Sequence, residues 1–76
     1  MIEINIEYCE KWNYKPEFDR VSKIINKNFP SINVIGNETS PRSGAFEITF
    51  NGKLVYSKFE TNKFPTEEEI ISILTC

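Results

Sequence analysis

The chain has 76 residues, of which 39% are hydrophobic and 26% are charged, and its formal net charge is -2. This length allows one small domain, residues 1–76, and no segment approaches the ~18 consecutive apolar residues of a membrane span. Nine basic residues scattered among eleven acidic ones form no basic patch for nucleic acid or an anionic membrane. We therefore expect a cytoplasmic monomer that binds neither nucleic acid nor a membrane.

The chain contains two cysteines, Cys9 and Cys76, and no histidine. Two cysteines are too few for a disulfide scaffold, and they cannot supply the three or four ligands of a zinc site. Histidine, which is absent, is the usual general base at neutral pH. Any chemistry must therefore come from a thiol, a carboxylate or a lysine, and we expect neither a metal nor a bound cofactor.

The first half of the sequence predicts a β-α-β unit. Apolar and polar residues alternate over 2–8, which is typical of a strand that ends just before Cys9. A helix begins near Pro16, carries apolar side chains at spacings of three and four, and is stopped by Pro30. The β-branched run 31–35 predicts a second strand, which runs parallel to the first through a right-handed crossover.

The second half of the sequence predicts a β-hairpin and a last helix. Asn51-Gly52 supplies the positive-φ pair of a type I′ turn between strands over 45–50 and 53–59. Thr66 and Glu69 form a capping box at the start of a C-terminal helix. The buried face of that helix carries four aliphatic residues, Ile70, Ile71, Ile73 and Leu74.

This order of elements predicts an α/β (α+β) fold. It is a minimal thioredoxin-like βαβ-ββα arrangement with a four-stranded mixed sheet, strand order 2-1-3-4, and two helices. Ligands of open α/β sheets bind at the carboxyl ends of the parallel strands, and Cys9, the polar loop 37–44 and the connection 60–65 all reach that end. The last helix runs away from it, which puts Cys76 roughly 15 Å distant and argues against a disulfide with Cys9.

Four segments carry a family resemblance that extends over essentially the whole chain. Tyr8 to Pro16 reads YCEKWNYKP, and the other segments are Gly44 to Ile48, Asn51 to Lys58, and Phe64-Pro65. Together they resemble the selenoprotein W-like family, also called Rdx or SelT/SelW/SelH, with features of its selenoprotein W branch and of its migration and invasion enhancer branch. The resemblance implies a thioredoxin-like fold in a cytosolic thiol-redox protein associated with glutathione.

The redox motif of that family is Cys-x-x-Sec or Cys-x-x-Cys after the first strand, and only its first position carries over, onto Cys9. Trp12 occupies the second position, so this loop has no resolving sulfur and cannot run a dithiol cycle. Monothiol chemistry stays open, in which Cys9 forms a sulfenic acid or a mixed disulfide that glutathione or a thiol-bearing protein resolves. The alternative is a redox-inactive domain that binds a protein through Trp12 and the loops 37–44 and 60–65.

The charges near Cys9 act in both directions on its reactivity. Lys11 and Arg42 favour a thiolate, whereas Glu7 and Glu10 oppose it. Reactivity also requires an exposed sulfur, since a cysteine packed at a strand end is inert. A buried Cys9 would therefore favour the interaction domain, and an exposed sulfur would favour redox chemistry.

Three further residues are expected to line this end of the sheet. Pro41 occupies the region where thioredoxin-like proteins place a cis-proline opposite the cysteine, although a trans Ser40-Pro41 bond is the default. Trp12 is either an aromatic that packs over the first helix or an exposed binding residue. For Arg42, we expect a solvated loop residue rather than an anion clamp.

Overall fold

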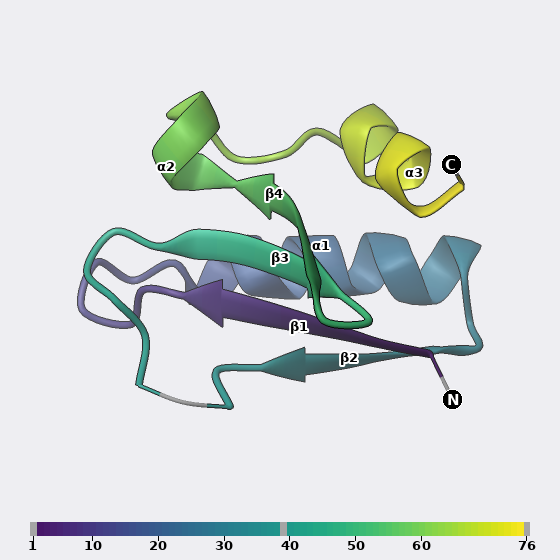
Figure 1. Cartoon of the computed structure of the whole chain (residues 1–76), viewed down its shortest axis with the longest axis horizontal. Coiled ribbons are helices and arrows are strands. Elements are labelled where there is room, and N and C mark those ends of the chain that lie inside the picture. The colour runs from purple at the N-terminus through teal and green to yellow at the C-terminus, as the bar shows by residue number, and fades with distance from the viewer. Residues whose placement is uncertain (1, 39, 76) are drawn as a thin grey trace.

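The computed structural model, which describes residues 2–38 and 40–75, has a β-α-β unit followed by a β-hairpin and two helices. The ribbon in Figure 1 follows them from the N-terminal strand to the C-terminal helix. The elements are β1 (Ile2–Tyr8), α1 (Lys15–Asn28), β2 (Ile32–Gly36), β3 (Phe46–Phe50), β4 (Lys53–Ser57), α2 (Lys58–Thr61) and α3 (Glu67–Thr75).

The four strands form one mixed sheet of order β2-β1-β3-β4. β1 and β2 are parallel neighbours, and β3 is antiparallel to both β1 and β4. The hairpin turn has positive φ at both Asn51 (49°) and Gly52 (84°), as a type I′ turn requires. The predicted strand order and mixed thioredoxin-like sheet are confirmed.

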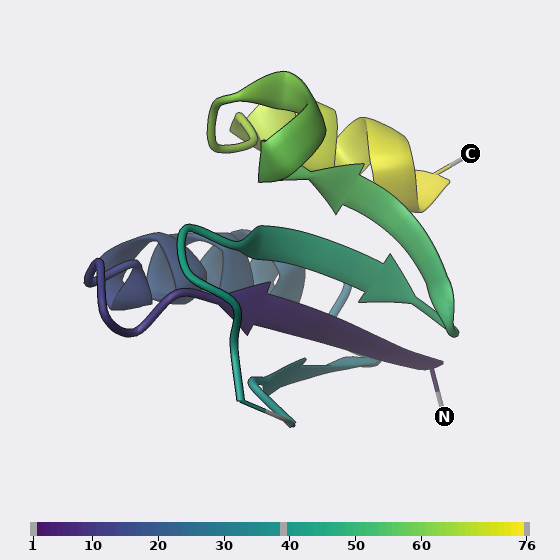
Figure 2. The same ribbon diagram turned by 60° about the vertical axis from the view of Figure 1, so that its left-hand side comes forward.

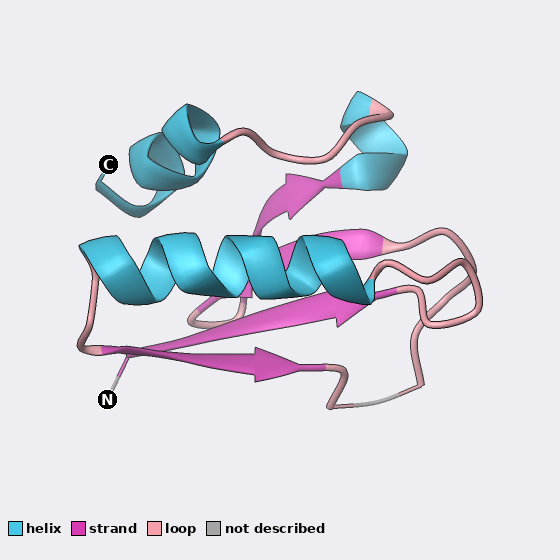
Figure 3. Cartoon of the chain, turned by 180° about the vertical axis from the view of Figure 1, so that it is seen from behind, coloured by secondary structure: helices cyan, strands magenta, loops and turns pink. Residues whose placement is uncertain are grey.

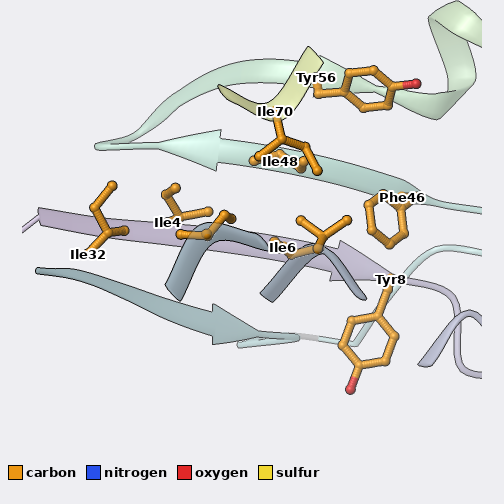
Figure 4. Close-up of a cluster of buried hydrophobic side chains, with 10 residues drawn as sticks. Ile4, Ile6, Tyr8, Ile32, Phe46, Ile48, Tyr56 and Ile70 are labelled. Carbon is orange, nitrogen blue, oxygen red and sulfur yellow. The ribbon is translucent and has the colours of Figure 1, made fainter. Parts of the chain in front are cut away.

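One face of the sheet carries the helices and the hydrophobic core. α1 runs along this face and α3 contacts α1, an arrangement that is visible from behind the sheet in Figure 3. Because side chains alternate along a strand, the even-numbered residues of β1 point toward α1 and the odd-numbered ones point away. Figure 4 shows several of the core side chains. The core consists of Ile4, Ile6, Tyr8, Val21, Ile25, Ile32, Phe46, Ile48, Tyr56 and Ile70.

The predicted strand over 53–59 is wrong at its C-terminal end, and the one-turn helix α2 was missed. Glu47 is the physical reason, because its carboxylate accepts hydrogen bonds from the Ser57 hydroxyl (2.7 Å) and the Lys58 backbone N–H (2.9 Å). These contacts end β4 at Ser57. The chain turns there into α2, and Figure 2 shows the path of the ribbon from the strand into this short helix. Asn62, with φ 60°, ends α2 in the left-handed region.

The ends of the two longer helices follow the expected signals. Pro16 lies in the first turn of α1, and the helix ends at Asn28, before Pro30. At the start of α3, Thr66 N–H donates to the Glu69 carboxylate (2.9 Å) while Glu69 N–H donates to the Thr66 hydroxyl (3.1 Å), which confirms the capping box. None of the helices formed by the described residues has the length and apolar character to cross a bilayer. The position predicted for Cys76 lies outside the described residues.

Candidate functional site

Cys9 directly follows β1, at the end of the sheet where the sequence predicts the site. Its backbone N–H donates to the Ala45 carbonyl (2.9 Å), and its carbonyl accepts from the Tyr14 N–H (3.0 Å). The residue is 1% exposed. Cys9 is therefore held on both sides of its backbone, and its sulfur is covered rather than open to solvent.

A turn over residues 10–13 lies between Cys9 and α1. The turn is closed by a hydrogen bond from Asn13 N–H to the Glu10 carbonyl (3.1 Å), and Asn13 adopts a left-handed φ of 60°. This conformation aims the Trp12 backbone N–H at the sulfur of Cys9, 3.3 Å away. The site thus supplies one hydrogen-bond donor that stabilises negative charge on the sulfur.

The indole ring of Trp12 lies on the loop that precedes β3. A Cβ atom placed on Gly44 would stand 2.9 Å from the ring, and Gly44 itself has φ +75°. Tyr14 meets the same ring edge to face, with centroids 6.2 Å apart. Trp12 is nevertheless 58% exposed, so most of its side chain is open to solvent.

Arg42 lies in a loop with its side chain 64% exposed, as expected of a solvated loop residue, and it is also paired with Glu7. Its guanidinium binds the Glu7 carboxylate in a bidentate pair, with Nη2 2.9 Å from Oε1 and Nε 3.0 Å from Oε2. Its backbone N–H also donates to Glu7 Oε2 (2.7 Å). The hydrogen bond from the Arg42 side chain lowers the pKa of the Glu7 carboxyl below its usual range, against the opposing effect of burial.

Glu7 and Glu47 stand directly opposite each other on β1 and β3, on the face of the sheet opposite α1. Like charges in this position repel. Arg42 Nη2 lies 3.8 Å from Glu47 Oε1 as well as 2.9 Å from Glu7 Oε1. A single guanidinium therefore offsets the repulsion between two carboxylates that face each other across neighbouring strands.

Asn37 holds the start of the polar loop, a role that the sequence analysis missed. Its side-chain amide accepts from the Tyr8 N–H (2.8 Å) and donates to the Tyr8 carbonyl (3.0 Å) and to the Glu10 carboxylate (3.0 Å). Asn37 therefore extends the pairing of β1 beyond the end of β2. The available signal was an asparagine directly after Gly36, a residue type that tolerates the φ of 46° seen here.

The remaining predicted site residues do not bond to Cys9. Among the described residues, no hydrogen bond or ion pair joins Lys11, Pro41 or Arg42 to Cys9. No described peptide bond is cis, so the Ser40-Pro41 bond is trans, as expected. Within residues 2–38 and 40–75, acidic and cysteine side chains do not gather in groups of three or more as a metal site requires.

A comparison against known families matches the Rdx family over residues 3–75. The chain belongs to the Rdx family. Migration and invasion enhancer 1 from Bos taurus is 32% identical over 73 residues, which cover 96% of this chain and 62% of that relative. Selenoprotein W from Ovis aries is 34% identical over 58 residues, which cover 75% of this chain and 67% of that relative.

A solved structure supports the Rdx fold. The selenoprotein W-related protein from Vibrio cholerae superposes with a TM-score of 0.83 at 22% identity, covering 97% of this chain and 92% of that one. The family resemblance and the thioredoxin-like fold predicted from the sequence are therefore confirmed. This Rdx chain spans less than two thirds of the length of the Migration and invasion enhancer 1 protein it matches.

Proposed function

We propose that this Rdx protein is a thiol-redox protein that works through the single sulfur of Cys9, with glutathione as its co-substrate. One observation carries the proposal: the Trp12 N–H donates to the sulfur of Cys9 (3.3 Å), and Trp12 stands where the family motif has its second cysteine or selenocysteine. The turn thus keeps a hydrogen bond to the first sulfur although the second sulfur is absent. Membership of the Rdx family supports the same interpretation.

The proposed reaction removes glutathione from a mixed disulfide. The Cys9 thiolate attacks the glutathionyl sulfur, so an S–S bond forms between Cys9 and glutathione while the bond to the substrate sulfur breaks. The substrate leaves as a thiolate and takes a proton from solvent. A thiolate of a second glutathione then attacks the adduct, which releases the Cys9 thiolate and glutathione disulfide. The substrate sulfur is reduced to a thiol, its former glutathionyl group and one free glutathione form glutathione disulfide, and no second cysteine is needed.

The burial of Cys9 is the outcome expected of the interaction domain, and it sets a condition on redox chemistry. A thiolate attacks a disulfide along the axis of the S–S bond that breaks. Cys9 is only 1% exposed, so a glutathionyl group cannot reach its sulfur in that geometry. The reaction therefore requires the turn 10–13 to open, and it proceeds from the open state. The closed state that the structure describes protects the thiol.

Mass spectrometry after treatment with oxidised glutathione tests the proposal. Wild type and Cys76→Ser should both gain a glutathione adduct on Cys9 that reduced glutathione removes, and Cys9→Ser should gain none at this position. Site-resolved detection is needed because the chain has two cysteines. Absence of an adduct on Cys9 in the folded protein would overturn the proposal.

A second function, a redox-inactive interaction domain, is favoured by the burial of Cys9 and by the exposure of two aromatic side chains, one next to Cys9 in the turn and one against Arg42. Trp12 is 58% exposed and Phe59 is 49% exposed. Exposed aromatic side chains are frequent energetic centres of protein interfaces. Affinity enrichment from cells with wild type, Cys9→Ser and Trp12→Ala separates the two functions: an interaction domain keeps its partner in Cys9→Ser and loses it in Trp12→Ala.

A further inference from the structure

We propose that Glu7 and Arg42 are positioning residues that form a latch, which keeps the cover over Cys9 closed. The latch is the Glu7–Arg42 ion pair, and the cover is the turn 10–13 together with the loop 42–45. The inference rests on the proposed function of Cys9 and concerns the regulation of that site. Neither latch residue bonds to the sulfur, so both act through the backbone and through Trp12.

The latch holds the loop 42–45 at its first residue. Three hydrogen bonds of 2.7, 2.9 and 3.0 Å join Arg42 to the Glu7 carboxylate, one from the backbone and two from the guanidinium. The guanidinium also lies over the ring of Phe59, 5.1 Å from its centroid. Arg42 is thereby fixed between β1 and α2 although its side chain is 64% exposed.

The loop held by Arg42 is the same loop that contacts both Cys9 and Trp12. The Arg42 carbonyl accepts from the Ala45 N–H (3.2 Å), and the Ala45 carbonyl accepts from the Cys9 N–H (2.9 Å). Gly44, between them, lies against the Trp12 ring, and the Trp12 N–H reaches the sulfur. A continuous set of contacts therefore runs from Arg42 to the cover over Cys9.

Losing Arg42 has a larger effect than losing an ordinary surface ion pair. Without Arg42, the opposed carboxylates of Glu7 and Glu47 repel each other across β1 and β3. Glu47 cannot swing away, because Ser57 and Lys58 hold its carboxylate and the residue is 5% exposed. The strain is relieved by movement of the loop 42–45, which is the segment that supports the cover.

Alkylation of Cys9 by iodoacetamide tests the latch in a Cys76→Ser background, where Cys9 is the only thiol of the chain. We expect Glu7→Gln to raise the alkylation rate about two- to fivefold, the range expected for loss of an exposed ion pair, and Arg42→Gln to raise it further because Glu7 and Glu47 then repel each other. A direct effect of charge on the thiol predicts opposite changes, faster in Glu7→Gln and slower in Arg42→Gln. Acceleration in both variants therefore supports the latch, and a slower rate in Arg42→Gln overturns it.

Asp19→Asn is the matched control, because it breaks another exposed ion pair, Lys15–Asp19 (2.9 Å), on α1. Its alkylation rate should equal that of the background. Local opening also predicts that low urea concentrations leave the accelerated rates unchanged, whereas alkylation through global unfolding rises steeply with urea. A steep rise in the Glu7 and Arg42 variants overturns the latch.

The two proposals fail separately in these experiments. If Cys9 forms no glutathione adduct but both variants accelerate alkylation, the latch is supported and the redox function is contradicted. If the adduct forms but the variants are alkylated at the background rate, the redox function is supported and the latch is contradicted.

Discussion

The backbone N–H of Trp12 donates to the sulfur of Cys9 at 3.3 Å, while the side chain of the same tryptophan lies on Gly44. One residue thus contacts the thiol through its backbone and the neighbouring loop through its ring. A change at either contact is expected to alter the reactivity of Cys9.

Gly44→Ala should open the site. The new Cβ would stand 2.9 Å from the Trp12 ring, and alanine is strained at φ +75°. We expect about 1–2 kcal/mol of lost unfolding free energy, measured by urea denaturation, and faster alkylation of Cys9. Gly52→Ala is the control, because Gly52 also has positive φ (+84°) but has nothing within 4 Å of the new Cβ. Equal alkylation rates in the two variants would show that the ring contact does not cover the thiol.

Trp12→Cys should restore the two-sulfur motif. The N–H of residue 12 already approaches the sulfur of Cys9, so the turn brings the two positions together. We expect a disulfide between residues 9 and 12 that forms with a mild oxidant, is reversed by dithiothreitol, and is detected by mass spectrometry in a Cys76→Ser background. A correctly folded variant that forms no such disulfide would show that the geometry of this turn differs from that of a dithiol motif.

Gly36→Ala should destabilise the core without strain in the backbone. The added Cβ would lie 2.7 Å from the ring of Phe18 and 3.0 Å from that of Tyr8, and these rings stack with centroids 4.5 Å apart. We expect about 1–3 kcal/mol of lost unfolding free energy, measured by urea denaturation. Phe18→Leu in the same chain makes room for the methyl group and should recover part of the loss. Additive losses in the double variant would contradict this packing explanation.

The stability of the protein should fall in acid partly through Glu7. Its folded-state pKa is lowered by the hydrogen bond from Arg42, so its contribution is fully present above the unfolded-state pKa of about 4.3. That contribution is lost as the pH falls through the lower, folded-state value. Urea denaturation from pH 7 to pH 3 should show a shallower decline for Glu7→Gln than for wild type.

A residual decline should remain in Glu7→Gln, because the capping hydrogen bond from Thr66 N–H also lowers the pKa of Glu69. Parallel curves for wild type and Glu7→Gln would contradict the role given to the Arg42 hydrogen bond. The same titration therefore separates the latch from the helix cap.

Local patterns in the sequence were sufficient to predict most of the fold. The alternation over β1, the Asn51-Gly52 turn and the Thr66–Glu69 box each depend on neighbours within a few residues, and the structure confirms all three. By contrast, α2 depends on Glu47, which reaches Ser57 and Lys58 from another strand. No pattern within the segment 53–59 contains that information.

The candidate site was less predictable for the same reason. Cys9 was identified from the family motif, but its burial depends on contacts with Ala45 and the turn 10–13 that form only in the folded chain. Arg42 pairs with Glu7 across 35 positions of sequence. Such long-range pairs follow from the topology of the sheet and leave no spacing in the sequence by which to find them.

The most direct test of the central claim is the rate of glutathione adduct formation on Cys9, resolved by site, in Cys76→Ser and in Cys76→Ser with Arg42→Gln. A monothiol site behind a latched cover predicts a slow, reversible adduct in the first protein and a faster one in the second. The claim is contradicted if neither folded protein forms the adduct while the urea-unfolded chain does, since Cys9 would then be a structural cysteine.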